Sequence, residues 1–587
     1  MPLWLGINED LFDSGVALGD GEKVLFASNE ERYTRRKNEG GFPQRALASL
    51  FAYTGVAPAD VDCVCMSGLM TPPPPVRLLP RSHRWLYNAR REKKDSLLRK
   101  VLDDATFYLP VSHTSETSLL RKLSVPFLPL MTRMVLPGVL KRKPIRYVEH
   151  HVGHAAAAWK LSGFEEALVL SIDGMGDGLS LLVLQCVPGR PMKRLWAVSS
   201  RDSLGLFFQV LAEAFGFVSC RDEGKITGLA AGGVAENVTV PFPFHYQDGH
   251  LEFTGGFGFG QRGIDWAKRT LADQFRREDL AAWAQENLEK YVVEIARTYL
   301  QQTGLRHLAV AGGVVANVKL NQRLHELPEV ERLFVLPNMG DGGLGLGALC
   351  AHDGIAPQRV RDVFWGESYT DAEIEPVLRN AGLQYRRVED IEAETAALLA
   401  QGDIVARFSG RMEWGPRALG NRSILVRTTD RAVVNRLNHL LKRSDFMPFA
   451  PAILREDAAL YCIHPEPAYH AAEFMTVCFD CTDKMKGENP AIVHLDGTAR
   501  AQLVCRENNP GFHKILTLFK EKTGSSVVLN TSFNVHEEPI IRTPQEAVTA
   551  FLKARLDYLA IGEFLVNGVD GNDLIRPACD CVAPEAL

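Results

Sequence analysis

The sequence predicts a mixed α/β protein with two domains. Its 587 residues, 46% of them hydrophobic, exceed what one hydrophobic core usually holds. Segments 3–27 and 167–198 share a pattern of strand, polar turn and hairpin, so we expect a duplicated N-terminal domain with a cleft between its halves. The pattern resets over 355–370, and a second α/β region follows. The expected domains are 1–355 and 365–587.

The duplicated pattern consists of short apolar strands separated by polar turns. The strands are expected at 3–7, 15–18 and 24–27 in the first copy and at 167–172, 179–185 and 194–198 in the second. An acidic, glycine-rich turn at 173–178 follows the first strand of the second copy. This arrangement resembles the actin-like ATPase and sugar-kinase (ASKHA) superfamily, in which the cleft holds metal and nucleotide.

Glycines follow two further strands of the first domain. A helical pattern over 283–299 leads into 308–313, a strand that ends in two glycines, and 333–342 is a strand that ends in an acidic glycine turn before a helix. Backbone N–H groups between a strand and a helix bind phosphate. Each cluster is weak evidence alone, because 255–260 is also glycine-rich with no obvious helix behind it.

Residues 71–145 differ from both halves and are expected to form a variable basic insertion. Prolines at 72–75 predict an extended spacer, and basic side chains alternate with Leu and Trp over 77–100. One interpretation is a helical insertion with a solvated basic face. The other is contact with an acidic partner or a membrane surface.

The second domain alternates strands with helices. Strands are expected at 404–408 and 526–529. Thr370 and Thr543 each precede a helical pattern with Glu three residues later, which is the signature of a capping box, and Pro544 occupies the first helical position after Thr543.

Two histidines and two aspartates form a candidate metal site. His150 and His154 are four residues apart at the start of an alanine-rich helical segment, so both project from one face. Asp173 and Asp341 each follow an apolar strand in a glycine turn. Without these acids, an ordinary histidine pair on a short helix would be the better interpretation. The mixed ligand set suits Fe(II), Mn(II), Zn or Mg, and ligand type alone does not choose among them.

The segment 409–423 is the strongest local signal in the chain. It contains three arginines among glycines, one proline and Glu413. Guanidinium groups match phosphate oxygens, and glycines let the backbone approach a ligand, so the segment predicts an anion-binding loop. An ordinary basic turn is the alternative.

Composition limits the classes of function. A net charge of −5 and an isoelectric point of about 6.4 give no overall reason to expect nucleic acid. The N-terminus has no signal-peptide pattern, and no stretch reaches the roughly 18 apolar residues of a membrane span, so we expect a cytoplasmic protein. The 11 cysteines do not form a disulfide framework, and Cys478 and Cys481 are expected to be plain thiols.

The motifs together closely resemble the NodU/CmcH family of ATP-dependent carbamoyltransferases, which place carbamoyl groups on hydroxyls of small molecules. The resemblance covers nearly the whole chain. Its carriers are 29–37 with 41–43, 150–154, 223–230, 311–317, the Asp341 turn, the arginine segment from Gly410, 447–451, 496–500 and 529–534.

The resemblance implies both fold and reaction. The N-terminal domain would be similar to tRNA threonylcarbamoyl-transfer proteins, and the C-terminal domain would be YrdC-like. Carbamoyl phosphate would lose its phosphate in the second domain, and the carbamate would attack ATP to give carbamoyl adenylate and pyrophosphate. The adenylate would carry the carbamoyl group to the metal, with Fe(II) favoured by the resemblance and Mg or Mn as alternatives.

The resemblance also implies roles for single residues. Residues expected to bind carbamoyl phosphate and the adenylate are Arg411, Arg417, Arg422, Lys442, Arg500, Asn530 and Ser532, and the four basic residues Arg417, Arg422, Lys442 and Arg500 are expected to be catalytic. Residues expected to contact nucleotide are Lys37, Lys225, Gly312, Gly313, Asn317, Asp341 and Gly342. The metal ligands would be His150, His154, Asp173 and Asp341.

The chain departs from the family pattern at two positions. Phe12 stands where relatives commonly carry a histidine that is a candidate base for the acceptor hydroxyl, and phenylalanine cannot take a proton. Asp13 is the expected substitute, with Glu9, Asp10 and His151 as alternatives, unless the acceptor needs no strong base. Met447 stands where many relatives have arginine, which removes or replaces one phosphate contact.

Two other functions were weighed against transfer to a small-molecule hydroxyl. A tRNA-modifying enzyme of the threonylcarbamoyl type would use both domain types, but the acidic net charge argues against it. A nucleotide sensor or scaffold that has lost the transfer activity would explain why Phe12 replaces the histidine. The complete sets of expected metal ligands and arginines argue against such a loss of activity. The acceptor and the oligomeric state, a homodimer included, are left open.

Overall fold

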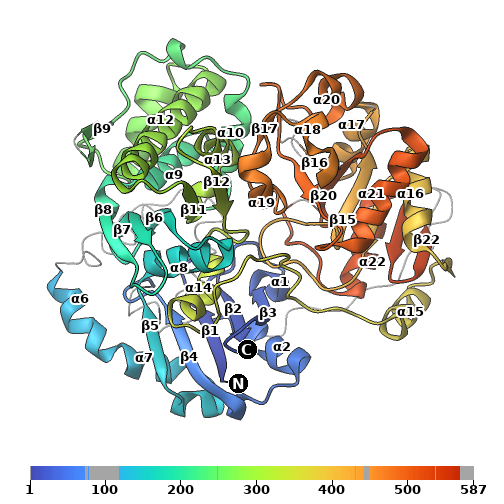
Figure 1. Ribbon diagram of the computed structural model, residues 1–587, viewed down its shortest axis with the longest axis horizontal. Helices are drawn as coiled ribbons and strands as arrows, with labels where there is room; N and C mark the ends of the chain where they lie inside the picture. Colours follow the sequence, from blue (N-terminus) through green and yellow to red (C-terminus); the bar gives the residue numbers. More distant parts are fainter. Residues whose placement is uncertain are drawn as a thin grey trace.

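The computed structural model describes residues 2–72, 77, 118–247, 249–429, 431–441, 449–535 and 537–568. Most of the predicted insertion, Lys442 and Met447 lie outside the described residues. The fold is mixed α/β, as predicted, with several sheets (Figure 1). None of the described helices combines the length and the apolar character that crossing a membrane requires.

The first region contains two five-stranded sheets with the same topology. In each sheet the first three strands form an antiparallel meander, and the next two strands add in parallel beside the first. The orders are β3-β2-β1-β4-β5 and β8-β7-β6-β11-β12. The strands are β1 (Leu3–Asn8), β2 (Gly15–Gly19), β3 (Val24–Asn29), β4 (Val61–Ser67), β5 (Ile145–Val148), β6 (Ala167–Gly176), β7 (Leu179–Cys186), β8 (Lys193–Ser199), β11 (His307–Ala311) and β12 (Arg332–Val335). The predicted duplication is confirmed by this shared order.

Two helices are packed between the two sheets (Figure 1). They are α8 (His150–Ser162) and α14 (Leu344–Ala351). Glycines make the packing close: a Cβ on Gly6 of β1 would lie 2.0 Å from the Gly345 carbonyl oxygen, and one on Gly347 would lie 2.5 Å from that of Gly153. The helix with the histidines therefore lies directly beside the helix that follows Asp341.

The predicted helix over 283–299 is part of α12 (Arg277–Thr303), and its apolar residues at helical spacing are buried. The glycine-rich stretch 255–260 does lead into a helix, α11 (Gln261–Ala267), contrary to the sequence interpretation. The remaining helices of this region are α1 (Glu31–Thr34), α2 (Gln44–Thr54), α6 (Leu119–Ser124), α7 (Leu128–Val135), α9 (Leu204–Ala214), α10 (Gly224–Ala230) and α13 (Val318–His325), and β9 (Phe244–Gln247) and β10 (His250–Phe253) form a hairpin.

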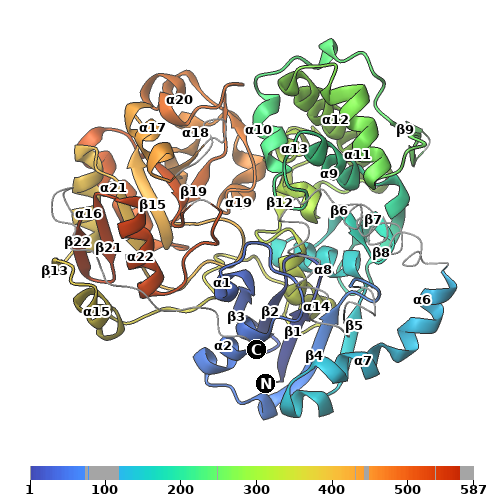
Figure 2. The ribbon, with the colours of Figure 1, turned by 180° about the vertical axis from the view of Figure 1, so that it is seen from behind.

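The last part of the chain is built on an eight-stranded mixed sheet beside the first region (Figures 1 and 2). Its order is β13 (Tyr385–Arg387), β22 (Phe564–Asn567), β21 (Tyr558–Ile561), β14 (Val405–Phe408), β15 (Arg422–Arg427), β20 (Val527–Ser532), β16 (Ala450–Leu454) and β19 (Gln502–Val504). Its helices include α15 (Asp371–Asn380), α16 (Ile391–Gln401), α17 (Arg431–Leu440), α18 (Ala458–Tyr461), α19 (Tyr469–Ala472), α20 (Asp483–Glu488), α21 (Pro510–Thr523) and α22 (Pro544–Ala554).

Both predicted helix caps of this region are confirmed. Thr370 and Glu373 form a reciprocal capping box at α15. The Thr543 hydroxyl accepts a hydrogen bond from the Glu546 backbone N–H at 3.1 Å, with Pro544 at the first position of α22.

Candidate active site

One cavity of about 1200 Å³ runs between the duplicated region and the C-terminal region. Its lining includes predicted site residues from both. Those from the first region are Asp13, Lys37, Asp173, Lys225, Gly313, Asn317 and Asp341, and those from the second are Arg417, Arg500, Asn530 and Ser532. Residues that the sequence assigns to two sites therefore line one shared cavity.

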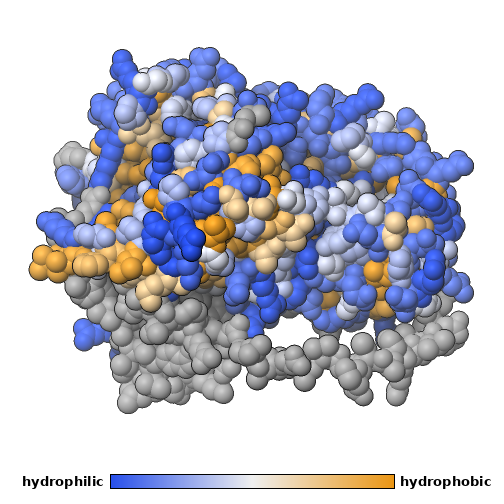
Figure 3. Space-filling view, turned by 90° about the horizontal axis from the view of Figure 1, so that it is seen from below, coloured by the Kyte–Doolittle hydropathy of each residue, from blue (hydrophilic) through white to orange (hydrophobic). Residues whose placement is uncertain are grey.

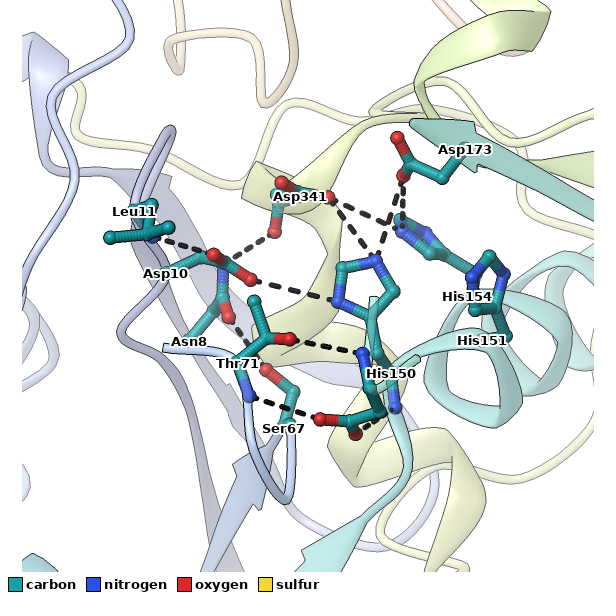
Figure 4. A network of polar contacts seen from close by, with 12 residues as sticks. Asn8, Asp10, Leu11, Ser67, Thr71, His150, His151, His154, Asp173 and Asp341 are labelled. Carbon is teal, nitrogen blue, oxygen red and sulfur yellow. Dashed lines mark hydrogen bonds and ion pairs between the residues drawn. The ribbon is translucent and has the colours of Figure 1, made fainter. Parts of the chain in front are cut away.

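The four predicted metal ligands come together (Figure 4), and two of them, Asp173 and Asp341, line this cavity. One ligand atom from each of His150, His154, Asp173 and Asp341 lies within 4.8 Å of the others. Nε2 of His154 is 3.2 Å from Oδ2 of Asp173 and 3.5 Å from Oδ1 of Asp341. Nε2 of His150 is 3.6 Å and 3.5 Å from the same two oxygens.

The start of α8 is held by two acids. Glu149 is its N-cap and accepts a hydrogen bond from the Val152 backbone N–H at 2.9 Å. Asp177 accepts from the His150 backbone N–H at 2.9 Å and from the N–H groups of Met70 and Thr71. These bonds fix where both histidines project, because they satisfy the orphan N–H groups of the helix N-terminus. The sequence analysis did not identify Asp177, although it lies in the acidic turn at 173–178.

The donor set fits a divalent cation. Within the part of the chain that the structure describes, both ring nitrogens of His150 and of His154 are buried without a hydrogen-bond partner, and so is Oδ1 of Asp341. Burial, followed by repulsion from Asp173, raises the pKa of Asp341 to about 7. Buried polar atoms are normally paired, so a cluster of unpaired nitrogens and a carboxylate oxygen is what an ion would complete. Two imidazoles and two carboxylates suit Fe(II), Mn(II) or Zn better than Mg, which prefers oxygen ligands.

The candidate acceptor bases occupy different surroundings. The Glu9 carboxylate pairs with the Arg77 guanidinium at 2.8 Å, and both are buried. Asp10 lies 3.6 Å from Nδ1 of His150, so it lies behind a metal ligand. His151 is buried, with its ring nitrogens bonded to the Ser171 hydroxyl at 2.8 Å and the Leu179 carbonyl at 3.0 Å. The geometry thus removes His151 and Glu9 from consideration.

Asp13 remains the best placed of these groups. It lines the cavity next to Phe12 and accepts a hydrogen bond from the Asn29 amide at 2.8 Å. Burial, followed by repulsion from Glu31, raises the pKa of its carboxyl to about 8. A base with a pKa near neutrality is well matched to proton transfer. A Cβ on Gly342 would lie 2.0 Å from the Asn29 amide nitrogen, so that glycine lets the Asp341 turn pack against this pair.

The predicted nucleotide residues have distinct roles. Gly313 donates its backbone N–H to Oδ2 of Asp173 at 3.1 Å. Gly312 has φ +100°, and a Cβ there would lie 2.2 Å from the Ile172 carbonyl oxygen, so it permits close packing; like Gly342, it is outside the cavity lining. Asn317 lines the cavity, caps α13 and bonds with Gln285 at 2.7 Å. Lys37 and Lys225 line the cavity, and Lys225 pairs with Asp222 at 3.1 Å.

Glu413 organises the arginine segment. Its buried Oε1 accepts backbone hydrogen bonds from Leu419 at 2.9 Å, Asn421 at 2.8 Å and Arg422 at 3.0 Å. These bonds close the loop that carries Arg417 into the cavity. Three N–H donors on one ionised oxygen form a strong, charge-assisted arrangement. The sequence analysis noted Glu413 in this segment but did not predict this role.

Two of the three arginines of the segment do not line the cavity, which corrects their predicted role. Arg411 donates to the carbonyls of Leu25, Trp365 and Gly366 at 2.9, 2.6 and 2.9 Å. Arg422 is fully buried and donates to the carbonyls of Ser409, Gly410, Glu367 and Asn421. Burial lowers the pKa of Arg422 to about 10. Both guanidinium groups hold backbone segments together rather than face a ligand.

The other predicted phosphate contacts lie in the cavity. The Arg500 guanidinium has a buried Nε without a hydrogen-bond partner, and burial lowers its pKa. Asn530 donates to the Ala418 carbonyl at 3.1 Å and to the Gln502 side chain at 2.6 Å. Ser532 is at the end of β20 and also lines the cavity. Lys442 falls outside the described residues.

Direct contacts fasten the two regions around the cavity. Arg32 donates to the Gly415 carbonyl at 2.6 Å, and Arg35 donates to those of Pro539 and Ile540 at 2.7 and 2.8 Å. The Lys319 ammonium pairs with Asp496 at 2.8 Å. Arg32 and Arg35 of the motif 29–37, to which the sequence assigned no role, thus hold the C-terminal region in place.

Comparison with known proteins identifies the family. A family model described as "Carbamoyltransferase N-terminus" matches residues 4–350, and one described as "Carbamoyltransferase C-terminus" matches residues 396–568. The chain belongs to this carbamoyltransferase family. It is 31% identical to nodulation protein NolNO of Sinorhizobium fredii over 95% of this chain and 79% of that protein. It is 34% identical to nodulation protein NolO of Bradyrhizobium diazoefficiens over 72% of this chain and 79% of that protein.

Among solved structures, this carbamoyltransferase matches full-length HypF in a phosphate- and nucleotide-bound form with a TM-score of 0.34. That match has 13% identity and covers 60% of this chain and 55% of HypF. A likeness this weak carries no argument about fold or ligand. The expected boundary between the domains falls in 351–395, between the two matched regions, and stays a prediction.

Proposed function

We propose that this carbamoyltransferase makes carbamoyl adenylate from ATP and carbamoyl phosphate and transfers the carbamoyl group to a hydroxyl of a small molecule. The single observation that supports this proposal is the shared cavity, which is lined both by the metal-cluster carboxylates and by Arg417 and Arg500. In this proposal the first region is an actin-like nucleotide and metal domain, and the second is a YrdC-like adenylate-forming domain.

The first step would take place beside the C-terminal sheet. Water cleaves carbamoyl phosphate to carbamate and phosphate. A carbamate oxygen then attacks the α-phosphorus of ATP, and pyrophosphate leaves. Arg417 and Arg500 line the cavity, and in this proposal they would neutralise the charge that develops on phosphate oxygens. Because carbamate is short-lived in water, a closed cavity favours its capture over its decay.

The second step would take place at the metal cluster. The acceptor oxygen attacks the carbamoyl carbon of the adenylate, AMP leaves, and Asp13 takes the hydroxyl proton. A divalent ion held by His150, His154, Asp173 and Asp341 would supply positive charge that polarises a carbonyl or grips phosphate. We propose Fe(II), with Mn or Mg as alternatives. Because residues of both sites line one cavity, the adenylate would have a short path between them.

A small nucleophile tests the proposal without a known acceptor. Hydroxylamine should intercept carbamoyl adenylate and release AMP and hydroxyurea in equal amounts. We expect hydroxyurea above the enzyme-free background only when ATP and carbamoyl phosphate are both present, and none above background with Arg417→Ala. Hydroxyurea formation that does not need ATP would contradict the adenylate, and AMP release without carbamoyl phosphate would favour a nucleotide-binding role.

A further inference from the structure

A continuous apolar stripe lies on the outer side of α6 and α7. Its residues follow one another at intervals of three or four, which places them on one helical face across the break between the two helices. They are Leu119, Leu123, Phe127, Leu130 and Met134, with exposed fractions of 70%, 57%, 61%, 61% and 65%. Apolar side chains reach the surface at the left edge of Figure 3, on the side where Figure 1 shows α6.

The opposite face of the same segment is also apolar and is already packed on the protein. Leu128 and Met131 are buried, and Thr132 accepts a hydrogen bond from the Tyr147 hydroxyl at 2.7 Å. Leu136 and Leu140 join the hydrophobic core beside the first sheet. A surface helix normally turns a polar face to water, so apolar residues on both faces indicate that the stripe serves contact with something else.

The charged side chains of the segment that carries the stripe all have one sign. Residues 118–148 contain seven basic side chains and no acidic one, in a chain whose net charge is −5. Lys122, Lys141 and Arg142 are exposed. Exposed apolar residues combined with Lys and Arg are typical of segments that lie in the interface of an anionic bilayer.

We propose that the α6–α7 face docks this enzyme onto an anionic lipid surface. A second copy of the chain fits the face less well, because two-fold pairing would bring the same basic residues of both copies together. An anionic bilayer satisfies both features at once: its headgroups attract the cations, and its acyl boundary accepts the five apolar side chains. The contact is peripheral and needs no spanning segment.

A hydrogen bond joins the docking face to the turn beside the predicted metal ligands. Arg121, in α6, donates to the Asp177 carbonyl at 2.6 Å, and the Asp177 carboxylate accepts from the His150 backbone N–H. One side chain therefore joins the lipid-facing helix to the turn that orients a metal ligand. Docking would place the metal end of the enzyme at the lipid surface.

Vesicle flotation tests the proposal with the full chain. The probes are vesicles of phosphatidylcholine alone and of phosphatidylcholine mixed with phosphatidylglycerol. The variants are a stripe variant, Leu123→Glu with Phe127→Glu and Leu130→Glu, and a charge variant, Lys122→Ala with Lys141→Ala and Arg142→Ala. The matched control is Leu460→Glu with Ile463→Glu, which changes two exposed apolar residues of the C-terminal region.

We expect wild type and control to float with the anionic vesicles only. The stripe variant should lose binding, and the charge variant should weaken it by roughly fivefold for each cation removed. Circular dichroism and pyrophosphate release check that each variant is folded. Failure of folded wild type to float, or flotation that the stripe variant leaves unchanged, overturns the proposal. A wild-type dimer that the stripe variant dissociates, without flotation, would assign the face to a second copy.

Discussion

Replacing Glu413 should damage stability and adenylation together. Glu413→Ala leaves the backbone N–H groups of Leu419, Asn421 and Arg422 buried without their acceptor. Each unsatisfied group costs about 1–3 kcal/mol, so three cost roughly 3–6 kcal/mol, since relaxation of the loop recovers part of the sum. Glu413→Gln keeps the shape of the side chain and loses only its charge, so it should lower the free energy of unfolding by about 2 kcal/mol.

Differential scanning calorimetry measures the first effect. At about 2–4 °C per kcal/mol, Glu413→Ala should lower the Tm of the affected transition by roughly 10 °C, and Glu413→Gln by about 5 °C. The matched control is Glu456→Gln, because Glu456 is exposed and, among the residues that the structure describes, its carboxylate pairs with His513 alone, at 2.9 Å. This control substitution should change the free energy of unfolding by no more than about 0.5 kcal/mol.

The same variants test whether the loop positions Arg417. Below the melting transition, pyrophosphate release should fall in Glu413→Ala towards the level of Arg417→Ala and fall less in Glu413→Gln. The reasoning is refuted if Glu413→Ala melts within 1–2 °C of wild type, an effect of at most about 1 kcal/mol. A large loss of stability with unchanged pyrophosphate release would refute the link to Arg417.

Three further changes separate the parts of the site. His154→Ala removes a metal ligand, so metal bound per chain, measured by mass spectrometry, should fall to near zero while carbamoyl-phosphate-dependent pyrophosphate release persists; full metal retention would contradict the assignment. Asp13 binds a proton in the folded chain at pH values between its ordinary pKa of 3.8 and about 8, so wild type should lose stability as pH rises through this window and Asp13→Asn should not. The difference in Tm between wild type and Asp13→Asn should widen from pH 5 to 8 and then level off. A difference that stays constant over this range would refute the raised pKa of Asp13. Arg35→Ala should split thermal unfolding into two transitions because it frees the 539–540 segment, whereas Arg36→Ala, at a side chain 41% exposed, should not.

Features that depend on neighbours along the chain were predictable from the sequence. The strand and helix pattern follows from local periodicity, and the metal quartet follows from the spacing of His150 and His154 together with acids at strand ends. The duplication was visible because both copies repeat the same order of apolar strands and turns, which the two sheets share. For the metal quartet and the duplicated strands, the position of each residue relative to a strand end or turn was enough for the prediction.

Features that depend on distant segments were not predictable. The composition of the arginine segment does not reveal which guanidinium faces the cavity. Arg411 donates to carbonyls of residues 25, 365 and 366, and Arg422 donates to carbonyls of its own loop and of residue 367. Asp177 acts on α8, which precedes it in the chain. The role of Arg35 needs residues 539–540 beside it. No local pattern encodes such long-range partners.

The most direct test of the account is pyrophosphate release from ATP in the absence of acceptor, with and without carbamoyl phosphate, in wild type and Arg417→Ala supplied with Mg²⁺ and Fe(II). The account predicts release that requires carbamoyl phosphate and is lost in Arg417→Ala, because adenylate formation precedes transfer and uses the arginine that lines the cavity. No release from wild type, or release that carbamoyl phosphate does not change, would contradict it.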